Sequence, residues 1–229
     1  MREEVTVLYE AKGGRRKLAG SFKALVASCV LLLAVFLILR WHGRSGYLAP
    51  TRVSAVADAR VRAQQVGMDP QQRNLWIPRK WDSAGFHFTA VAEFQLVARV
   101  LIATAISDDT EAQLAPVDLT LGWGPMADPQ FLKGVSLSHS GRFYHWETQD
   151  SSINTDLIVR HSANMHMIPK DRKVDRVLRQ IKADEIISLA GYLVDIEAEE
   201  DGWHWESSRT RNDSGAGACE VVWLDAIYR

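Results

Sequence analysis

The chain has 229 residues and a formal net charge of −1, with 27 lysine and arginine side chains against 28 aspartate and glutamate side chains. Residues 1–40 contain seven of these cations and three of these acids, so the remainder is acidic, which argues against nucleic acid as a partner. Only Cys29 and Cys219 are cysteines, so the fold must depend on a hydrophobic core and not on disulfides.

An uninterrupted apolar run, Ala24 to Leu39, dominates the N-terminal part of the chain. A bilayer span needs about 20 helical residues, and Leu18–Phe22 and Trp41 extend the run at its two ends. We therefore predict a transmembrane helix over residues 18–41. No suitable cleavage site follows the apolar core, which disfavours a secretory signal peptide, and most of the core follows Cys29, which disfavours lipidation.

The basic residues around this run predict its orientation. Five lysines and arginines lie in the fifteen residues before it and three in the fifteen after it, and positive charge favours the cytoplasmic side. We therefore expect a cytoplasmic tail over residues 1–17 and an exported C-terminal domain. This arrangement is that of a single-pass membrane protein whose C-terminal domain lies outside the cytoplasm.

Residues 42–85 are expected to connect the span to the exported domain. Glycines and Pro50 indicate a linker first, and Thr51 to Gln65 then has the apolar spacing of a short juxtamembrane helix. Met68 to Gly85 contains two prolines and scattered polar residues, and it is expected to be a loop.

Residues 86–229 are predicted to form one α+β domain, built mainly of antiparallel strands. Phe86 to Ile102 alternates between apolar and polar residues, which favours a strand, although part of it also fits a helix. A hairpin connection is expected at His139–Arg142, and Asp201-Gly202 provides a further turn. The other expected strands are Val117–Trp123, Val135–Leu137, Phe143–Trp146, Thr155–His161, Glu185–Ala198, Trp203–Thr210 and Cys219–Tyr228.

One amphipathic helix is expected over residues 171–183. Asp171 can cap its N-terminus, and its apolar residues recur at helical spacing to form one stripe. The strand Cys219–Tyr228 is apolar on both faces, so we predict that it is central and that this helix packs on one of its faces.

Recognised catalytic motifs are absent from the sequence: it contains no glycine-rich phosphate loop, paired CxxC, HExxH or GxSxG. His161 and His166 are five residues apart, and this spacing would not bring their side chains to one metal ion on either a strand or a helix. His139 and His145 lack acidic or cysteine neighbours at the spacing that metal ligands need. We therefore predict neither a metal nor another cofactor. The tryptophans could stack on sugars, but filling the core is the favoured interpretation.

Cys219 is the candidate nucleophile of an alternative hypothesis. His161 or His166 could activate its thiol, with Asn164 or Arg229 assisting. The order of histidine, cysteine and arginine is loosely similar to that of sortase transpeptidases, although their Thr-Leu-x-Thr-Cys motif is missing. This hypothesis describes a cysteine-dependent envelope hydrolase or transpeptidase. The competing interpretation is a small buried residue that begins a strand.

Five sequence blocks resemble a group of bacterial proteins that have one N-terminal span and an exported domain and to which no activity is assigned. The resemblance covers most of residues 86–225 and implies an envelope location, which is the bacterial inner membrane with the C-terminal domain periplasmic or otherwise extracytoplasmic. The blocks are LGWGPMAD at 121–128, SGRFYHW at 140–146, HSANMHMIP at 161–169, GYLV at 191–194 and SGAGACE at 214–220.

Polar residues near predicted turns are the candidates for a binding surface, because loops on a rigid sheet commonly carry function. These candidates are Trp123, Asp128, Asn164 and His166. The sequence thus predicts a membrane-anchored binding or accessory component of an envelope complex, with a protein partner. A glycan ligand is the weaker possibility.

Overall fold

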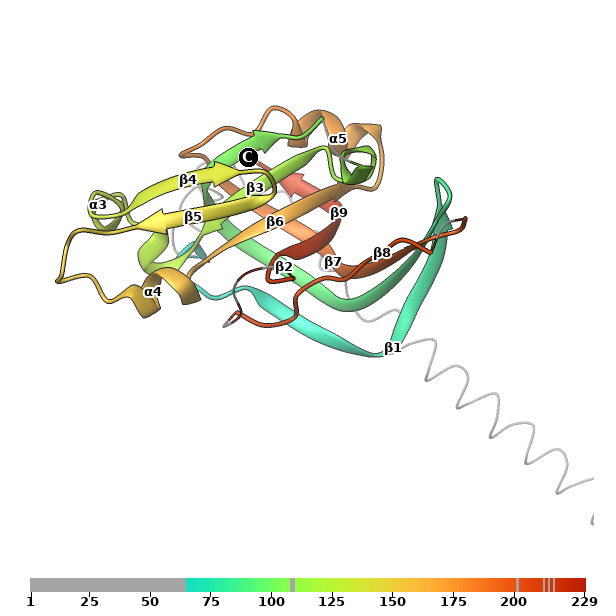
Figure 1. Ribbon diagram of the computed structural model, residues 1–229, viewed down its shortest axis with the longest axis horizontal. Coiled ribbons are helices and arrows are strands. Elements are labelled where there is room, and N and C mark those ends of the chain that lie inside the picture. The colour runs from blue at the N-terminus through green and yellow to red at the C-terminus, as the bar shows by residue number, and fades with distance from the viewer. Residues whose placement is uncertain (1–64, 108–109, 201, 212, 214, 216) are drawn as a thin grey trace, which may run out of the picture. The chain divides into compact units, whose positions relative to one another are not determined.

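The structure is a computed structural model that describes residues 65–229, apart from 108–109, 201, 212, 214 and 216 (Figure 1). The predicted cytoplasmic tail and transmembrane helix lie outside the described residues, and so does the predicted juxtamembrane helix except for Gln65. Within the part that is described, no helix has the length and apolar character needed to cross a membrane.

The described residues form a mainly antiparallel α+β fold, which confirms the predicted class. The strands are β1 (Gln71–Ser83), β2 (Phe86–Ala105), β3 (Val117–Gly122), β4 (Ser136–Ser140), β5 (Phe143–Glu147), β6 (Ser162–Pro169), β7 (Ile186–Ala198), β8 (His204–Trp205) and β9 (Glu220–Tyr228). The helices are the short 3-10 turns η1 (Thr110–Gln113) and η2 (Gly124–Ala127) and the α-helices α3 (Pro129–Leu132), α4 (Thr155–Arg160) and α5 (Arg172–Leu178).

Five of the strands close into a barrel in the order β2-β3-β6-β9-β7. The ring closes because β7 pairs with β2 as well as with β9. Neighbouring strands of the ring run antiparallel except β6 and β9, which are parallel. Helix α5 lies between β6 and β7 in the chain, which are the third and fourth ring strands in sequence order, and this connectivity is that of an OB-type Greek-key barrel. The edge strand β1 pairs with the first half of β2 and extends the sheet beyond the ring.

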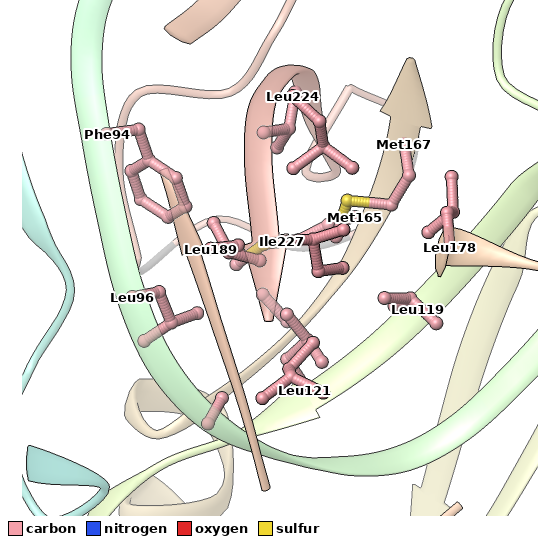
Figure 2. Packing of buried hydrophobic residues seen from close by; sticks show 14 of the residues in the cluster. Phe94, Leu96, Leu119, Leu121, Met165, Met167, Leu178, Leu189, Leu224 and Ile227 are labelled. Carbon is pink, nitrogen blue, oxygen red and sulfur yellow. The ribbon is translucent and has the colours of Figure 1, made fainter. Parts of the chain in front are cut away.

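The main hydrophobic core fills the barrel interior (Figure 2). Along β3, Leu119 and Leu121 belong to this core, whereas the alternate residues Asp118 and Thr120 are buried on the opposite face. Helix α5 begins as predicted: the Asp171 side chain accepts hydrogen bonds from the N–H groups of the first helical turn. The predicted apolar stripe of α5 packs against the interior residues of β9, and aromatic residues cover the other face of that strand.

Gly191 lets β7 and β9 approach closely where their register shifts. A Cβ atom at this position would lie only 1.9 Å from the backbone oxygen of Trp223. Because this obstacle is backbone in the neighbouring strand, a side chain cannot be accommodated by a rotamer change.

A second, aromatic cluster lies on the outer face of β2, β7 and β9. The ring of Trp81 stacks on Phe88 at 5.5 Å between centroids, and the edge of Trp223 meets both rings at 5.0 and 4.9 Å. Most tryptophans of the described part therefore pack against other apolar side chains, in agreement with the interpretation favoured from the sequence. Trp76 differs: it is 98% exposed, at a point where the pairing of β1 with β2 is interrupted.

Three predicted elements differ in the structure. Thr155–His161, expected as a strand, contains helix α4, because the Asn154 side chain caps the N–H of Asp156 and starts a helix. The strand expected at Trp203–Thr210 is reduced to the two residues of β8, since the following serines bond to side chains and local backbone. Met68–Gly85, expected as a loop, contains the long edge strand β1, where proline is tolerated.

Candidate functional site

A buried polar centre joins the barrel to the hairpin formed by β4 and β5. Asp118 on β3 is fully buried, and its Oδ1 accepts hydrogen bonds from Arg142 Nη1 at 2.8 Å and from His166 Nδ1 at 2.9 Å. His166 stands beside Asp118 because the two are register partners in the β3–β6 ladder. Arg142 comes from the hairpin tip, which lies against the outer face of β3 and β6 (Figure 1).

His139 is the fourth member of this polar centre. Its Nε2 lies 3.8 Å from Asp118 Oδ2, and neither atom has a hydrogen-bond partner among the described residues. Burial lowers the pKa of His139, and the attraction of Asp118 opposes that effect. We therefore define the polar centre as Asp118, His139, Arg142 and His166.

Trp205 of β8 covers the polar centre from the connection between β7 and β9. Its ring centroid lies 4.8 Å from that of His166, and Arg142 Cζ lies 5.4 Å from the Trp205 ring centroid. Trp203 contacts the same indole at 6.0 Å. Three segments distant in sequence thus meet at one point on the barrel surface.

A cleft of about 500 Å³ opens beside Trp205. The walls come from the β2–β3 loop, the hairpin tip, β6 and the β7–β9 connection, and their ionisable groups are of both signs. The residues that line this cleft are Glu111, Arg142, Phe143, His166, His204, Trp205, Glu206, Gly217 and Cys219.

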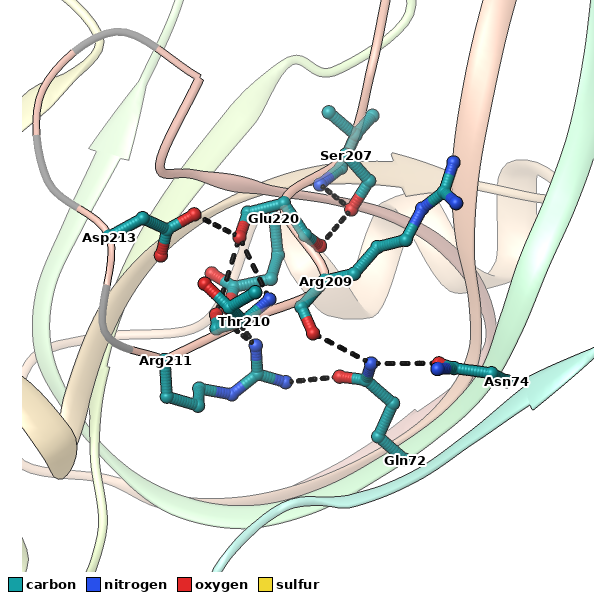
Figure 3. Close-up of polar contacts among 10 residues, drawn as sticks. Gln72, Asn74, Ser207, Arg209, Thr210, Arg211, Asp213 and Glu220 are labelled. Atoms are coloured by element: carbon teal, nitrogen blue, oxygen red, sulfur yellow. Dashed lines mark hydrogen bonds and ion pairs between the residues drawn. The ribbon is translucent and has the colours of Figure 1, made fainter.

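Cys219 and Phe143 also line a smaller space of about 150 Å³, here called the inner pocket. Residues 162–164 of β6, the aromatic residues of β5 and the segment before β9 surround it. Glu220 opens β9 at this pocket and is only 1% exposed. Arg211 Nη1 donates to Glu220 Oε1 at 2.5 Å, and Arg211 Nη2 donates to Gln72 Oε1 at 2.8 Å (Figure 3).

Burial raises the pKa of Glu220 to about 7, and the attraction of Arg211 opposes this rise. Glu220 Oε2 has no hydrogen-bond partner among the residues that the structure describes. Glu220 is thus a buried acid among the residues of the inner pocket, and one of its oxygens has no donor within the described part of the chain.

The candidate nucleophile Cys219 lies between the cleft and the inner pocket. Its Sγ is 3.9 Å from Asn164 Nδ2 and 3.8 Å from the backbone oxygen of Arg142. Burial raises the pKa of this thiol to about 11. The structure therefore brings Cys219, Asn164 and His166 close together, but His166 Nδ1 donates to Asp118 Oδ1 and not to the thiol.

His161, the other candidate base, lies elsewhere. Its Nδ1 contacts the backbone oxygen of Leu157 at 2.9 Å, and its Nε2 is 4.0 Å from Asp69 Oδ1. It lines neither the cleft nor the inner pocket.

The four residues expected at a binding surface occupy different environments. Trp123 is fully buried in the core and donates through Nε1 to Asp69 Oδ1 at 3.2 Å. Asp128 is exposed and caps α3 by accepting from the Gln130 N–H at 2.8 Å. Asn164 and His166 are buried where the hairpin meets the barrel, so they support the site from beneath its surface.

Sequence reasoning missed Asp118, Arg142 and Glu220 as site residues, and it considered Trp205 only among the tryptophans that could stack on a sugar. The one local signal was Asp118, the only charged residue of its strand, since buried carboxylates are rare unless they are paired. In the described part of the chain, no group of three histidine, cysteine or acidic side chains could hold a metal ion. Comparisons of the chain with protein families, with curated proteins and with solved structures found no match.

Proposed function

We propose that the chain is a membrane-anchored accessory component of the bacterial envelope, and that its cleft binds an extended segment of a partner protein. One observation supports the binding role above all: Arg142, His166 and Trp205, from three separate segments, are fixed against one another at the cleft. A site whose side chains are already ordered loses little conformational entropy on binding.

The position of the cleft on the barrel supports the same role. OB-type barrels bind oligonucleotides and oligosaccharides on the face of their second and third strands, beside the loops that follow the first and fourth, so the analogy supports a binding face and not a particular ligand. The equivalent parts here are β3 and β6, the β2–β3 loop and the β7–β9 connection, and residues from these elements form the cleft and its base. This support is an analogy at the level of the fold.

The chemistry of the cleft favours a polypeptide over nucleic acid or sugar. Binding of a phosphate backbone requires an excess of cations, whereas Glu111 and Glu206 accompany Arg142 in the cleft wall. Sugars stack on open aromatic faces, but the Trp205 ring is half-buried and already contacts His166 and Arg142, which leaves Phe143 as the exposed aromatic residue among those that line the cleft. A peptide offers groups of both charges and backbone donors and acceptors.

The state of Cys219 makes the hydrolase or transpeptidase hypothesis the weaker one. A cysteine nucleophile attacks as the thiolate, and a thiol with a pKa of about 11 is protonated at neutral pH. The proposed envelope location depends on the apolar run at residues 24–39, on its flanking charges and on the sequence resemblance.

A photo-crosslinking experiment in cells tests the proposed function. A photoreactive residue in place of His204, on the cleft rim, should give a discrete adduct between the full chain and one envelope protein. The same residue in place of Lys80, exposed on β1, is the matched control. Charge reversal at the rim by Glu206→Arg should weaken the His204 adduct at least fivefold. Identical adducts from both positions, insensitive to Glu206→Arg, would refute the cleft as the binding site.

A further inference from the structure

The edge strand β1 carries an apolar tip that the other described residues leave exposed. Between Asn74 and Arg79 its pairing with β2 is interrupted, and β1 bulges because four of its residues lie opposite one residue of β2. The middle of this bulge is Trp76, Ile77 and Pro78, here called the β1 tip. Trp76 is 98% exposed and Ile77 is 79% exposed. Neighbouring large apolar side chains that are exposed to this degree mark a protein or membrane contact.

Contacts on both sides of the β1 tip hold it in place. Before the tip, Leu75 packs against the aromatic cluster on the outer face of the barrel. After it, the Arg79 guanidinium donates to Tyr192 Oη and lies over the Tyr192 ring, 5.2 Å from the ring centroid. Farther along, Trp81 stacks on Phe88. The tip therefore projects from an ordered base, and little conformational entropy is lost when it binds another surface.

We propose that the β1 tip inserts into the interfacial region of the membrane that holds the predicted span, and that it docks the domain on an anionic lipid surface. Tryptophan is enriched at this depth of a bilayer, where its ring meets apolar chains and its N–H meets polar headgroups. The charge of β1 suits the same surface. The strand has three basic residues, Arg73, Arg79 and Lys80, against the single acid Asp82, whereas the chain after residue 40 is acidic as a whole. Basic side chains beside an inserted tip attract anionic headgroups.

The length of chain before β1 permits this contact. The docking rests on the membrane anchorage proposed above, in which the span ends at residue 41, 35 residues before Trp76. A segment of that length reaches at most about 120 Å when fully extended, so the domain stays near the membrane. Docking of a tethered domain is an intramolecular step, and a weak contact is therefore enough to populate the docked state.

Two features of β1 disfavour a second copy of the chain, or another protein, that would add a strand to this edge. Pro78 has no N–H to donate to an added strand, and the bulge bends the edge at the same point. Both are means by which natural proteins prevent edge strands from pairing. The edge is thus protected from strand addition exactly where its apolar side chains are most exposed.

The test uses the full chain reconstituted into vesicles of equimolar phosphatidylcholine and phosphatidylglycerol, with or without bromine near the top of the acyl chains. Bromine quenches a tryptophan that lies close to it. The emission of Trp76 is obtained as the difference between the wild type and Trp76→Phe, and it should be at least twofold lower in the brominated vesicles. The matched control is Trp146→Phe, because Trp146 is half-buried on β5, apart from β1 (Figure 1). The emission assigned to Trp146 should be unchanged by bromine.

Two variants measure the apolar and the electrostatic part of the docking equilibrium, each against its own Trp76→Phe form. Ile77→Ser removes exposed apolar surface and should lower the ratio of quenched to unquenched Trp76 about tenfold. Lys80→Gln removes one cation near the lipid surface and should lower this ratio about fivefold. The control Lys182→Gln changes an equally exposed lysine outside β1 and should leave the ratio unchanged. Ratios that did not respond to either β1 variant would overturn the proposal.

Extraction of the vesicles with alkaline carbonate tests the anchorage separately. If the chain is extracted, the proposed anchorage fails, and the docking fails with it. If the chain resists extraction but Trp76 is not quenched, the docking alone is refuted. Unquenched Trp76 emission that shifts to the blue as the protein-to-lipid ratio rises would identify a second copy of the chain as the occupant of the tip, and would refute the docking as well.

Discussion

Replacement of Asp118 by asparagine tests whether the polar centre fixes the β4–β5 hairpin to the barrel. Asparagine preserves the shape of the side chain but removes the negative charge that faces Arg142 and His166. Removing one partner of a buried ion pair costs about 3–5 kcal/mol, because the remaining charge keeps its desolvation penalty. The Arg142 side chain is 12% exposed and also bonds to the Ala115 backbone oxygen, so we expect the lower end, about 3 kcal/mol.

The assay is urea unfolding of the full chain in detergent micelles, followed by tryptophan fluorescence. The control is Asp195→Asn, which breaks the pair between Asp195 Oδ2 and Arg209 Nη2 at 2.7 Å, where the two side chains are 22% and 50% exposed. Solvent screening limits such pairs to about 1 kcal/mol or less. If the two variants lowered the free energy of unfolding equally, the polar centre would not stabilise the hairpin as argued.

Three further predictions follow from contacts described above. Gly191→Ala places a Cβ 1.9 Å from the Trp223 backbone oxygen, so it should cost more than about 4 kcal/mol or prevent accumulation of folded protein; a stable variant in urea titrations would contradict this. The Cys219 thiol should react slowly with maleimide at pH 7 in the native chain and rapidly in urea, because burial raises its pKa to about 11; fast native labelling would restore the hydrolase hypothesis. Folding raises the pKa of Glu220 from 4.5 to about 7, so the folded state binds the proton of this carboxyl more tightly than the unfolded state does. The stabilisation that protonated Glu220 contributes is therefore complete below pH 4.5 and is lost as the pH rises to 7. The stability of the wild type relative to Glu220→Gln should therefore fall by about 3 kcal/mol across that window in pH-dependent unfolding; a constant difference would contradict the shift.

The strands that local pattern determines were predictable from the sequence. The alternation in Phe86–Ile102 and the doubly apolar Cys219–Tyr228 correspond to β2 and β9, and the capped stripe after Asp171 corresponds to α5. The predicted secondary structure was wrong where one side chain or the position of a strand in the sheet had more influence than the pattern of apolar residues. At Asn154 a cap started a helix in a segment rich in β-branched residues, and the bulged β1 tolerated Pro78 because it is an edge strand.

The candidate site was less accessible from the sequence, because its members meet only through tertiary pairing. Asp118 and His166 are neighbours by register between strands that 39 residues separate, and Arg142 reaches them from inside that interval. Asn164 and His166 were named from the sequence because polar residues clustered there. No pattern in the sequence near Asn164 and His166 indicated the contact between His166 and Trp205, which lies in the connection between β7 and β9.

The position of β9 has a consequence for how the barrel assembles. This strand lies between β6 and β7, and both of these precede it in the chain. Until β9 arrives, β6 and β7 each present an unpaired edge, and such edges can capture strands of other molecules. Parallel pairing across a long interval also forms slowly. Insertion of β9 is therefore expected to be a late step of folding, and chains that stall before it are the ones at greatest risk of aggregation.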